Sequence, residues 1–321
     1  MKYYNIHGIV RVSSNVEGFI PKHFECKSLK NVDLEIREGD FEFNKKAHKK
    51  IDFKFYSGQN KAYFESLFYG RPIYKVLIAN LVGRTKLSFT TMTRRIFGVH
   101  ELIRMLLEIK LLQKGFTLVH AGGVAKENHG YLILGWSGIG KSSTIFGLAK
   151  ERDFEIFGDD RVILSKGGEI YSYPEKAGVF YRSRNIQNLN IPLSKRLELM
   201  FRYFIARFPP FNRYMSIKMA VDLSNIVTVG EVAKLDKVYF LERGQGKEKL
   251  NKKIALNRII ASTLQAFFDH YLSNKMFYAY CYVNGFDPGY IEKNMRKILE
   301  KSIRDCSIIR SEKKDFYKYL K

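Results

Sequence analysis

The feature that most constrains this chain is a glycine-rich segment between a short apolar run and a helical pattern. Residues 135–142 read GWSGIGKS and fit G-x-x-x-x-G-K-[ST], the pattern of phosphate-binding loops. Tyr131–Leu134 forms an apolar run suited to a buried strand, and Ser143–Lys150 has the periodicity of a helix. Strand, glycine loop and helix follow in the order that the motif requires. The pattern therefore predicts an α/β phosphate-binding domain.

Each part of the motif has a chemical reason. Gly135 and Gly140 allow backbone conformations in which successive N–H groups point into one concavity, and the following helix adds its N-terminal donors. Lys141 is predicted to reach the β- and γ-phosphates of a nucleotide, and the Ser142 hydroxyl to bind Mg²⁺. The candidate nucleotide-binding residues are Gly135, Ser137, Gly138, Ile139, Gly140, Lys141, Ser142 and Ser143.

A pair of acidic residues follows the loop after only one helix. Residues 155–158 read as the next strand, and Asp159 and Asp160 come directly after it. Two adjacent carboxylates are poorly satisfied in a core, so we expect them at the end of the strand, facing the phosphate loop. One can bind Mg²⁺ and the other can accept the proton of an attacking hydroxyl. The competing interpretation is a turn or helix cap, where Asp is common.

Three segments together resemble a known family. His120-Ala121, the loop GWSGIGKSS and the sequence GDDRV at 158–162 are similar to the catalytic core of the HPr kinase/phosphorylase family and its relatives, over about fifty residues. The resemblance implies a compact P-loop domain related to phosphoenolpyruvate carboxykinase, and phosphoryl transfer from a nucleotide to a serine hydroxyl. It further implies that Asp159 is the base, that Asp160 binds metal with Ser142, and that His120 lies near Asp159 and the reacting phosphate.

The chain also differs from that family's pattern. Ser143 and Trp136 stand where the family often has acidic residues, and the family's second glycine-rich signature has no clear counterpart. The resemblance therefore supports the kinase core more than HPr as the substrate or the reverse phosphorylase activity.

The rest of the chain predicts a second domain before the catalytic one. Val32–Ile36 and Ile51–Phe55 alternate apolar and polar residues, which indicates strands with one buried face. We therefore predict a small β-rich (α+β) N-terminal domain at 1–96 and the P-loop domain at 97–321. An amphipathic helix at Val99–Lys114 is expected to begin the P-loop domain, followed by a strand at Phe116–Ala125 that brings His120 near the loop.

Composition limits the partners and the compartment. The net charge of +23 favours nucleic acid, acidic membrane surfaces or acidic proteins, although base composition or a hot habitat would give the same excess. No apolar run is long enough for a membrane helix, and the three cysteines have no metal or disulfide spacing. We expect a cytoplasmic protein, and we keep both a monomer and a homo-oligomer as alternatives.

The leading functional prediction is a Mg²⁺-dependent kinase that transfers phosphate from ATP, or another nucleotide, to a hydroxyl. The acceptor would be a serine of a protein or peptide, or a small metabolite, with Asp159, His120 and Lys141 as catalytic residues and Ser142 and Asp160 at the metal. Arg182, Arg184 and Arg243 are candidates for stabilising the transferred group. The alternatives are a kinase of RNA hydroxyls, or a nucleic-acid-associated P-loop module that hydrolyses nucleotides.

Overall fold

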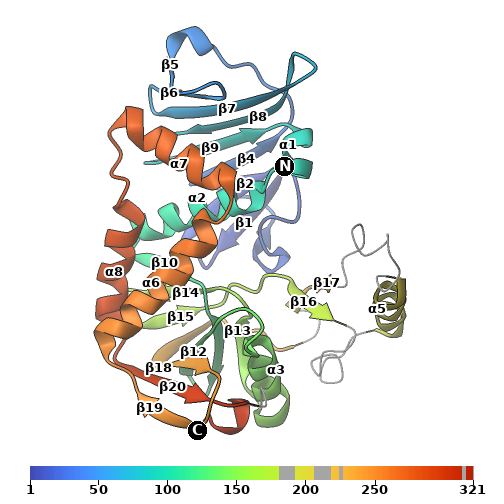
Figure 1. The fold of residues 1–321 in the computed structure, drawn as a ribbon, viewed down its shortest axis with the longest axis vertical. Coiled ribbons are helices and arrows are strands. Elements are labelled where there is room, and N and C mark those ends of the chain that lie inside the picture. Colours follow the sequence, from blue (N-terminus) through green and yellow to red (C-terminus); the bar gives the residue numbers. More distant parts are fainter. Residues whose placement is uncertain (181–191, 206–217, 224–226, 313–315, 321) are drawn as a thin grey trace. The chain divides into compact units, whose positions relative to one another are not determined.

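The chain divides into two compact units whose segments interleave in the sequence. The computed structural model describes residues 1–180, 192–205, 218–223, 227–312 and 316–320. Unit 1 comprises 1–117 and 260–298, and unit 2 comprises 118–259 and 299–321. The described part is a mixed α/β protein with two mixed nine-stranded sheets, one two-stranded sheet and seven α-helices (Figure 1). The α/β class is thereby confirmed.

The sheet of unit 1 contains both antiparallel and parallel pairs. Its order is β3-β1-β2-β4-β9-β8-β7-β6-β5, and β4 is parallel to both of its neighbours. The strands are β1 Lys2–Ile6, β2 Val10–Ser14, β3 Glu25–Cys26, β4 Leu34–Glu38, β5 Lys49–Lys50, β6 Phe55–Gly58, β7 Lys61–Phe68, β8 Arg71–Ala79 and β9 Thr85–Phe89.

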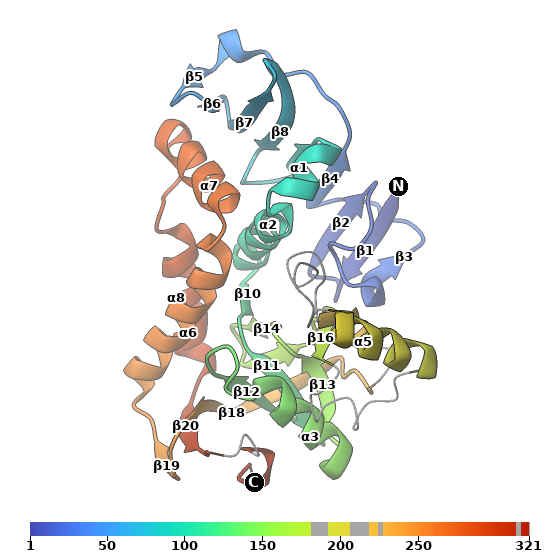
Figure 2. The same ribbon diagram turned by 45° about the vertical axis from the view of Figure 1, so that its right-hand side comes forward.

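Helices from two distant parts of the chain pack on this sheet. The α-helices that lie wholly in unit 1 are α1 Thr91–Ile96, α2 Val99–Gln113 and α7 Tyr271–Asn284. α2 contacts β2, β4 and α7, and α7 also contacts β6 and β7 (Figure 2). The helix predicted at Val99–Lys114 is confirmed as α2, and it belongs to unit 1. The contacts therefore divide the chain differently from the predicted boundary between residues 96 and 97.

The strand predicted at Ile51–Phe55 is wrong for its first four residues. Asp52 Oδ1 accepts hydrogen bonds from the backbone N–H groups of Lys54 (2.7 Å) and Phe55 (2.9 Å). This local bonding closes a turn between β5 and β6, because a short acidic side chain satisfies the backbone donors that a strand would need. Phe53 consequently points outward and is 91% exposed.

Unit 2 is built on the second nine-stranded sheet. Seven strands follow the order β10-β14-β15-β18-β12-β11-β13, and β20 pairs with β18 and β19. The strands are β10 Phe116–Val119, β11 Gly122–Lys126, β12 His129–Leu134, β13 Glu155–Gly158, β14 Val162–Ser165, β15 Glu169–Tyr171, β18 Val232–Glu242, β19 Gly246–Lys249 and β20 Asp305–Arg310. The separate pair is β16 Ala177–Phe180 and β17 Lys218–Val221.

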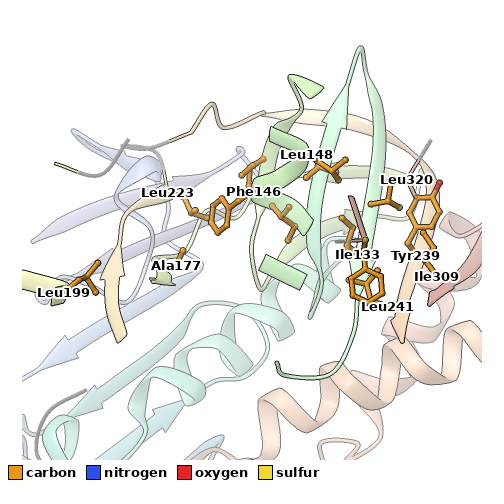
Figure 3. Close-up of a cluster of buried hydrophobic side chains, with 14 residues drawn as sticks. Ile133, Phe146, Leu148, Ala177, Leu199, Leu223, Tyr239, Leu241, Ile309 and Leu320 are labelled. Atoms are coloured by element: carbon orange, nitrogen blue, oxygen red, sulfur yellow. The ribbon is translucent and has the colours of Figure 1, made fainter. Parts of the chain in front are cut away.

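The remaining helices are α3, α5, α6 and α8. Their bounds are α3 Lys141–Arg152, α5 Leu193–Ile205, α6 Lys252–Phe268 and α8 Tyr290–Ser302, and a unit boundary falls within each of α6 and α8. α3 contacts β11, β12 and β13. Its side chains Phe146 and Leu148 join a core cluster with Ile133 and Tyr239 from the sheet (Figure 3). Fully burying one such side chain contributes about 1.5–3 kcal/mol, so this packing fixes α3, and with it the loop, on the sheet.

Candidate phosphate-binding site

The glycine-rich segment forms a tight turn between β12 and α3. Gly138 and Gly140 have φ values of 79° and 121°, in the region that side chains disfavour. A Cβ atom on Gly135 would lie 2.7 Å from Cγ2 of Ile139 and 3.3 Å from Cβ of Leu241. Ile139 itself packs against the core cluster. The glycines are therefore required by geometry, and the loop is anchored at its centre by one apolar side chain.

Strand register brings the predicted site residues to one edge of the sheet. β11 lies between β12 and β13 and is antiparallel to both, with Gly122 opposite Ile133 and Gly123 opposite Gly158. β12 and β13 therefore both end where β11 begins. Because His120 lies two residues before β11, it shares this edge with the loop at 135–142 and with the pair Asp159-Asp160. The strand predicted at Phe116–Ala125 is interrupted at His120 and Ala121, between β10 and β11.

The two aspartates contact the two residues that the motif assigns to phosphate and metal. Ser142 Oγ donates a hydrogen bond of 3.0 Å to Oδ2 of Asp159. Lys141 Nζ lies 3.0 Å from Oδ1 of Asp160 in an ion pair. Asp159 is buried, whereas the Asp160 side chain is 56% exposed. The loop and the carboxylate pair thus form one connected cluster at the start of α3.

Two further glycines permit this close approach. A Cβ on Gly122 would overlap Cδ1 of Ile145 from α3, and a Cβ on Gly158 would overlap the carbonyl oxygen of Arg161. Gly158 therefore allows the chain to turn sharply through Asp159 and Asp160 before β14 begins. Sequence reasoning did not single out these two glycines, although Gly158 begins the segment GDDRV and Gly122 directly follows His120-Ala121.

Sequence reasoning also missed Arg161. Its guanidinium is buried and its Nη1 donates a hydrogen bond of 2.9 Å to Oε2 of Glu175, in an ion pair of two mostly buried side chains. The predicted arginines are placed differently. Arg182 and Arg184 lie outside the described residues, and Arg243 is exposed just after β18, where its Nη1 donates to the backbone oxygen of Glu312. Among the described arginines, Arg161 therefore has the clearest electrostatic link to His120 and Asp160.

Burial and charge set the protonation of His120 and Asp160. Burial lowers the pKa of His120 to about 4, and the positive charges of Lys141 and Arg161 act in the same direction. His120 is therefore neutral at pH 7. Partial desolvation opposes ionisation of Asp160, but the charge and hydrogen bond of Lys141 outweigh it and hold the pKa of Asp160 below the usual value. The site thus combines a neutral imidazole with an ionised carboxylate.

The oxygen atoms of this cluster suit Mg²⁺ bound together with a nucleotide. Ser142 Oγ and the carboxylates of Asp159 and Asp160 are hard oxygen ligands, and Mg²⁺ at nucleotide sites takes one or two carboxylates and otherwise phosphate oxygens and water. Within the described residues, no group of three or more His, Cys, Asp or Glu side chains could hold a metal ion by itself. The donor set therefore fits a metal that arrives with phosphate.

The loop also carries the chain's single tryptophan. Trp136 is 77% exposed, and its carbonyl oxygen accepts a hydrogen bond of 3.2 Å from the N–H of Ile139. Ser137 and Gly138 are exposed beside it, and Ser143 is half-buried in the first turn of α3. An indole at this position gives the loop its own spectroscopic reporter.

Comparison with known proteins does not assign this chain to a family. No family model matches the sequence, and no curated protein matches it. The resemblance to the HPr kinase/phosphorylase family thus stays a prediction based on three short segments. In the part of the chain that the structure describes, no helix is long and apolar enough to cross a membrane.

Proposed function

We propose that unit 2 is a nucleotide-dependent kinase that phosphorylates a hydroxyl group. The observation that carries this proposal is the pair of contacts Ser142–Asp159 and Lys141–Asp160, both at 3.0 Å, at the N-terminal end of α3. A phosphate-binding loop in contact with two carboxylates combines donors for phosphate oxygens, ligands for a metal and a base. We expect a cytoplasmic enzyme that uses ATP or another nucleotide with Mg²⁺.

The backbone amides of 135–142 and Lys141 would hold the terminal phosphates of the nucleotide. Mg²⁺, when bound by Ser142 and Asp160, would supply positive charge to the phosphate oxygens. Asp159 would accept the proton of the acceptor hydroxyl. At the same time the hydroxyl oxygen would bond to the γ-phosphorus, and the bond between that phosphorus and the oxygen bridging it to the β-phosphorus would break. The displaced nucleoside diphosphate then leaves, and Asp159 returns its proton to solvent.

His120 and Arg161 would act on charge at the same edge. A neutral His120 can donate or accept one hydrogen bond without adding a positive charge beside Lys141. Arg161, held by Glu175, would be a positioning residue that contributes a fixed positive charge beside Asp160. The acceptor remains a serine of a protein or peptide, or a small metabolite.

The test is transfer of labelled phosphate. The purified chain is incubated with γ-labelled ATP, Mg²⁺ and a fractionated lysate, and the product is treated with protease or nuclease. Protease-sensitive label, or label in a small molecule, supports the proposal. Nuclease-sensitive label identifies an RNA hydroxyl as acceptor, and free phosphate alone indicates nucleotide hydrolysis without an acceptor, which would refute the kinase proposal.

Two variants assign the base. Asp159→Asn should lower transfer by about 10²–10⁴-fold while nucleotide binding is largely retained, because only the proton acceptor is lost. Asp153→Asn is the matched control: Asp153 is exposed at the other end of α3, and Asn tolerates its left-handed conformation at φ 55°. Full transfer activity in Asp159→Asn would show that Asp159 is not the base.

A further inference from the structure

A second charged site lies in unit 1, on the sheet face opposite to Leu34 and Ile36. Successive side chains of a strand point to opposite faces, so Glu35 of β4 shares its face with Arg37 and not with these two apolar neighbours. Ser13 of β2 and Lys86 of β9 are its register partners on the adjacent strands. Glu35 is nevertheless only 1% exposed.

Three cations surround this buried carboxylate. Arg37 Nε contacts Oε1, Arg84 Nη2 donates a hydrogen bond of 2.5 Å to Oε2, and Lys86 Nζ lies 3.8 Å from Oε1. The side chains of Arg37, Arg84 and Lys86 are 53%, 62% and 51% exposed. Burial opposes ionisation of Glu35, but the hydrogen bond of Arg84 and the charges of Lys86 and Arg37 outweigh it and lower its pKa. The three cationic side chains therefore contact the buried Glu35 and are also accessible to solvent.

A cavity of about 520 Å³ opens at this cluster. Residues 29–32, between β3 and β4, form part of its wall, and Tyr3, Ser13, Lys30, Glu35, Arg37 and Arg84 are among its lining residues. Lys30, Arg37 and Arg84 outnumber the single carboxylate, so the lining has an excess of positive charge. A volume in this range suits a small molecule, since ligand pockets measure about 300–1,000 Å³.

We propose that this cavity binds a small polyanion of the diphosphate or phosphate-ester class. Guanidinium groups match phosphate oxygens through paired N–H donors, and Glu35 orients two of them toward one opening. Nucleic acid is favoured less, because its binding sites carry cations along an extended stripe, whereas these cations converge on one carboxylate beside one cavity. The proposal rests on unit 1 alone and is independent of the kinase proposal for unit 2.

The experiment is a calorimetric titration of the full chain with pyrophosphate. All proteins carry Lys141→Ala, which weakens phosphate binding at the loop of unit 2, so that the signal reports unit 1. Arg84→Gln removes one guanidinium group and its charge, and Arg84→Lys keeps the charge but loses the paired N–H donors. Arg71→Gln, on exposed Arg71 of β8 away from the cavity lining, is the control for loss of one surface charge. Circular dichroism verifies that each variant is folded.

Saturable binding that Arg84→Gln weakens by about tenfold or more, Arg84→Lys weakens less, and Arg71→Gln leaves unchanged would support the site. No binding by the folded Lys141→Ala protein would overturn it, as would equal losses in Arg84→Gln and Arg71→Gln. A single-stranded RNA oligomer that binds more tightly than pyrophosphate and loses affinity in Arg84→Gln would overturn the small-molecule assignment in favour of nucleic acid. Failure of the kinase assay would leave every one of these outcomes unchanged.

Discussion

Substituting Asp160 should change nucleotide affinity in opposite directions with and without magnesium. In the structure, Lys141 Nζ pairs with Asp160 at 3.0 Å, so the carboxylate competes with any phosphate for this lysine. Asp160→Asn removes the competing charge and also its repulsion of the phosphate. Without Mg²⁺ we therefore expect tighter binding of the nucleotide. With Mg²⁺ we expect weaker binding, because the variant lacks the carboxylate that we propose as a ligand of the metal.

The size of the metal-free effect follows from the geometry of the pair. Coulomb's law across 3.0 Å gives about 1.4 kcal/mol in water and more where water is partly excluded. The Lys141 side chain is 9% exposed but the Asp160 side chain is 56% exposed, so screening limits the net gain to about 1–2 kcal/mol. This corresponds to an affinity about 5–30-fold higher for Asp160→Asn in the absence of metal. With Mg²⁺ present, we expect a loss of at least about tenfold.

The assay is calorimetric titration of a non-hydrolysable ATP analogue in excess EDTA and in excess Mg²⁺. Asp153→Asn, the same chemical change at the other end of α3, is the control and should alter neither affinity. A shift of Asp160→Asn in the same direction under both conditions would refute the assignment of Asp160 to both Lys141 and the metal. So would an equal shift in the Asp153→Asn control.

Three further predictions follow from the same edge of the sheet. The pKa of His120 is lowered from 6.5 to about 4, so the imidazole is protonated at a higher pH in the unfolded chain than in the folded one. The free energy of unfolding should therefore fall by up to about 3 kcal/mol between pH 6.5 and pH 4. Urea unfolding measures this loss, which should be absent from a His120→Gln variant. Gly158→Ala should cost about 1–3 kcal/mol in the same assay, because its Cβ would overlap the Arg161 carbonyl oxygen, and kinase activity should fall with it. Nucleotide binding should change the fluorescence of Trp136, which is 77% exposed in the loop, and Lys141→Ala should abolish that change at the same nucleotide concentration.

The part of the site that the sequence predicted is formed by residues that are neighbours in the sequence. Strand, loop and helix occupy consecutive residues, and the positive φ of Gly140 is a conformation that the motif's glycine allows. The placement of Asp160 beside Lys141 depended on strand order, which no local pattern encodes. The sequence predicted only that the two aspartates face the loop, because adjacent carboxylates are poorly satisfied in a core, and the register of β11 between β12 and β13 gives a geometric reason for this placement.

The features that were missed depend on contacts between distant residues. Arg161 pairs with Glu175 fourteen positions away, across β14 and β15, so neither residue is marked in the sequence as part of a buried ion pair. Unit 1 includes 260–298 because α7 packs on β6 and β7, about 200 residues earlier in the chain. Periodicity identifies a buried helix face but not the partner of that face. A boundary drawn from composition alone could not find such an interleaved division.

The contacts at the loop also indicate an order of events for the proposed reaction. Lys141 and Ser142 each contact one aspartate, so the proposed binding of nucleotide and metal would require both contacts to be exchanged. The Asp160 side chain is 56% exposed, so water can replace Lys141 at its carboxylate at a cost of no more than about 1–2 kcal/mol. Asp159 is buried, and breaking a hydrogen bond to a buried carboxylate costs more than breaking one to an exposed carboxylate. In the proposed reaction the exposed contact would therefore exchange first and free Lys141 for phosphate. The buried hydrogen bond between Ser142 and Asp159 would exchange later, which would make Ser142 available to hold the metal and Asp159 available as the base.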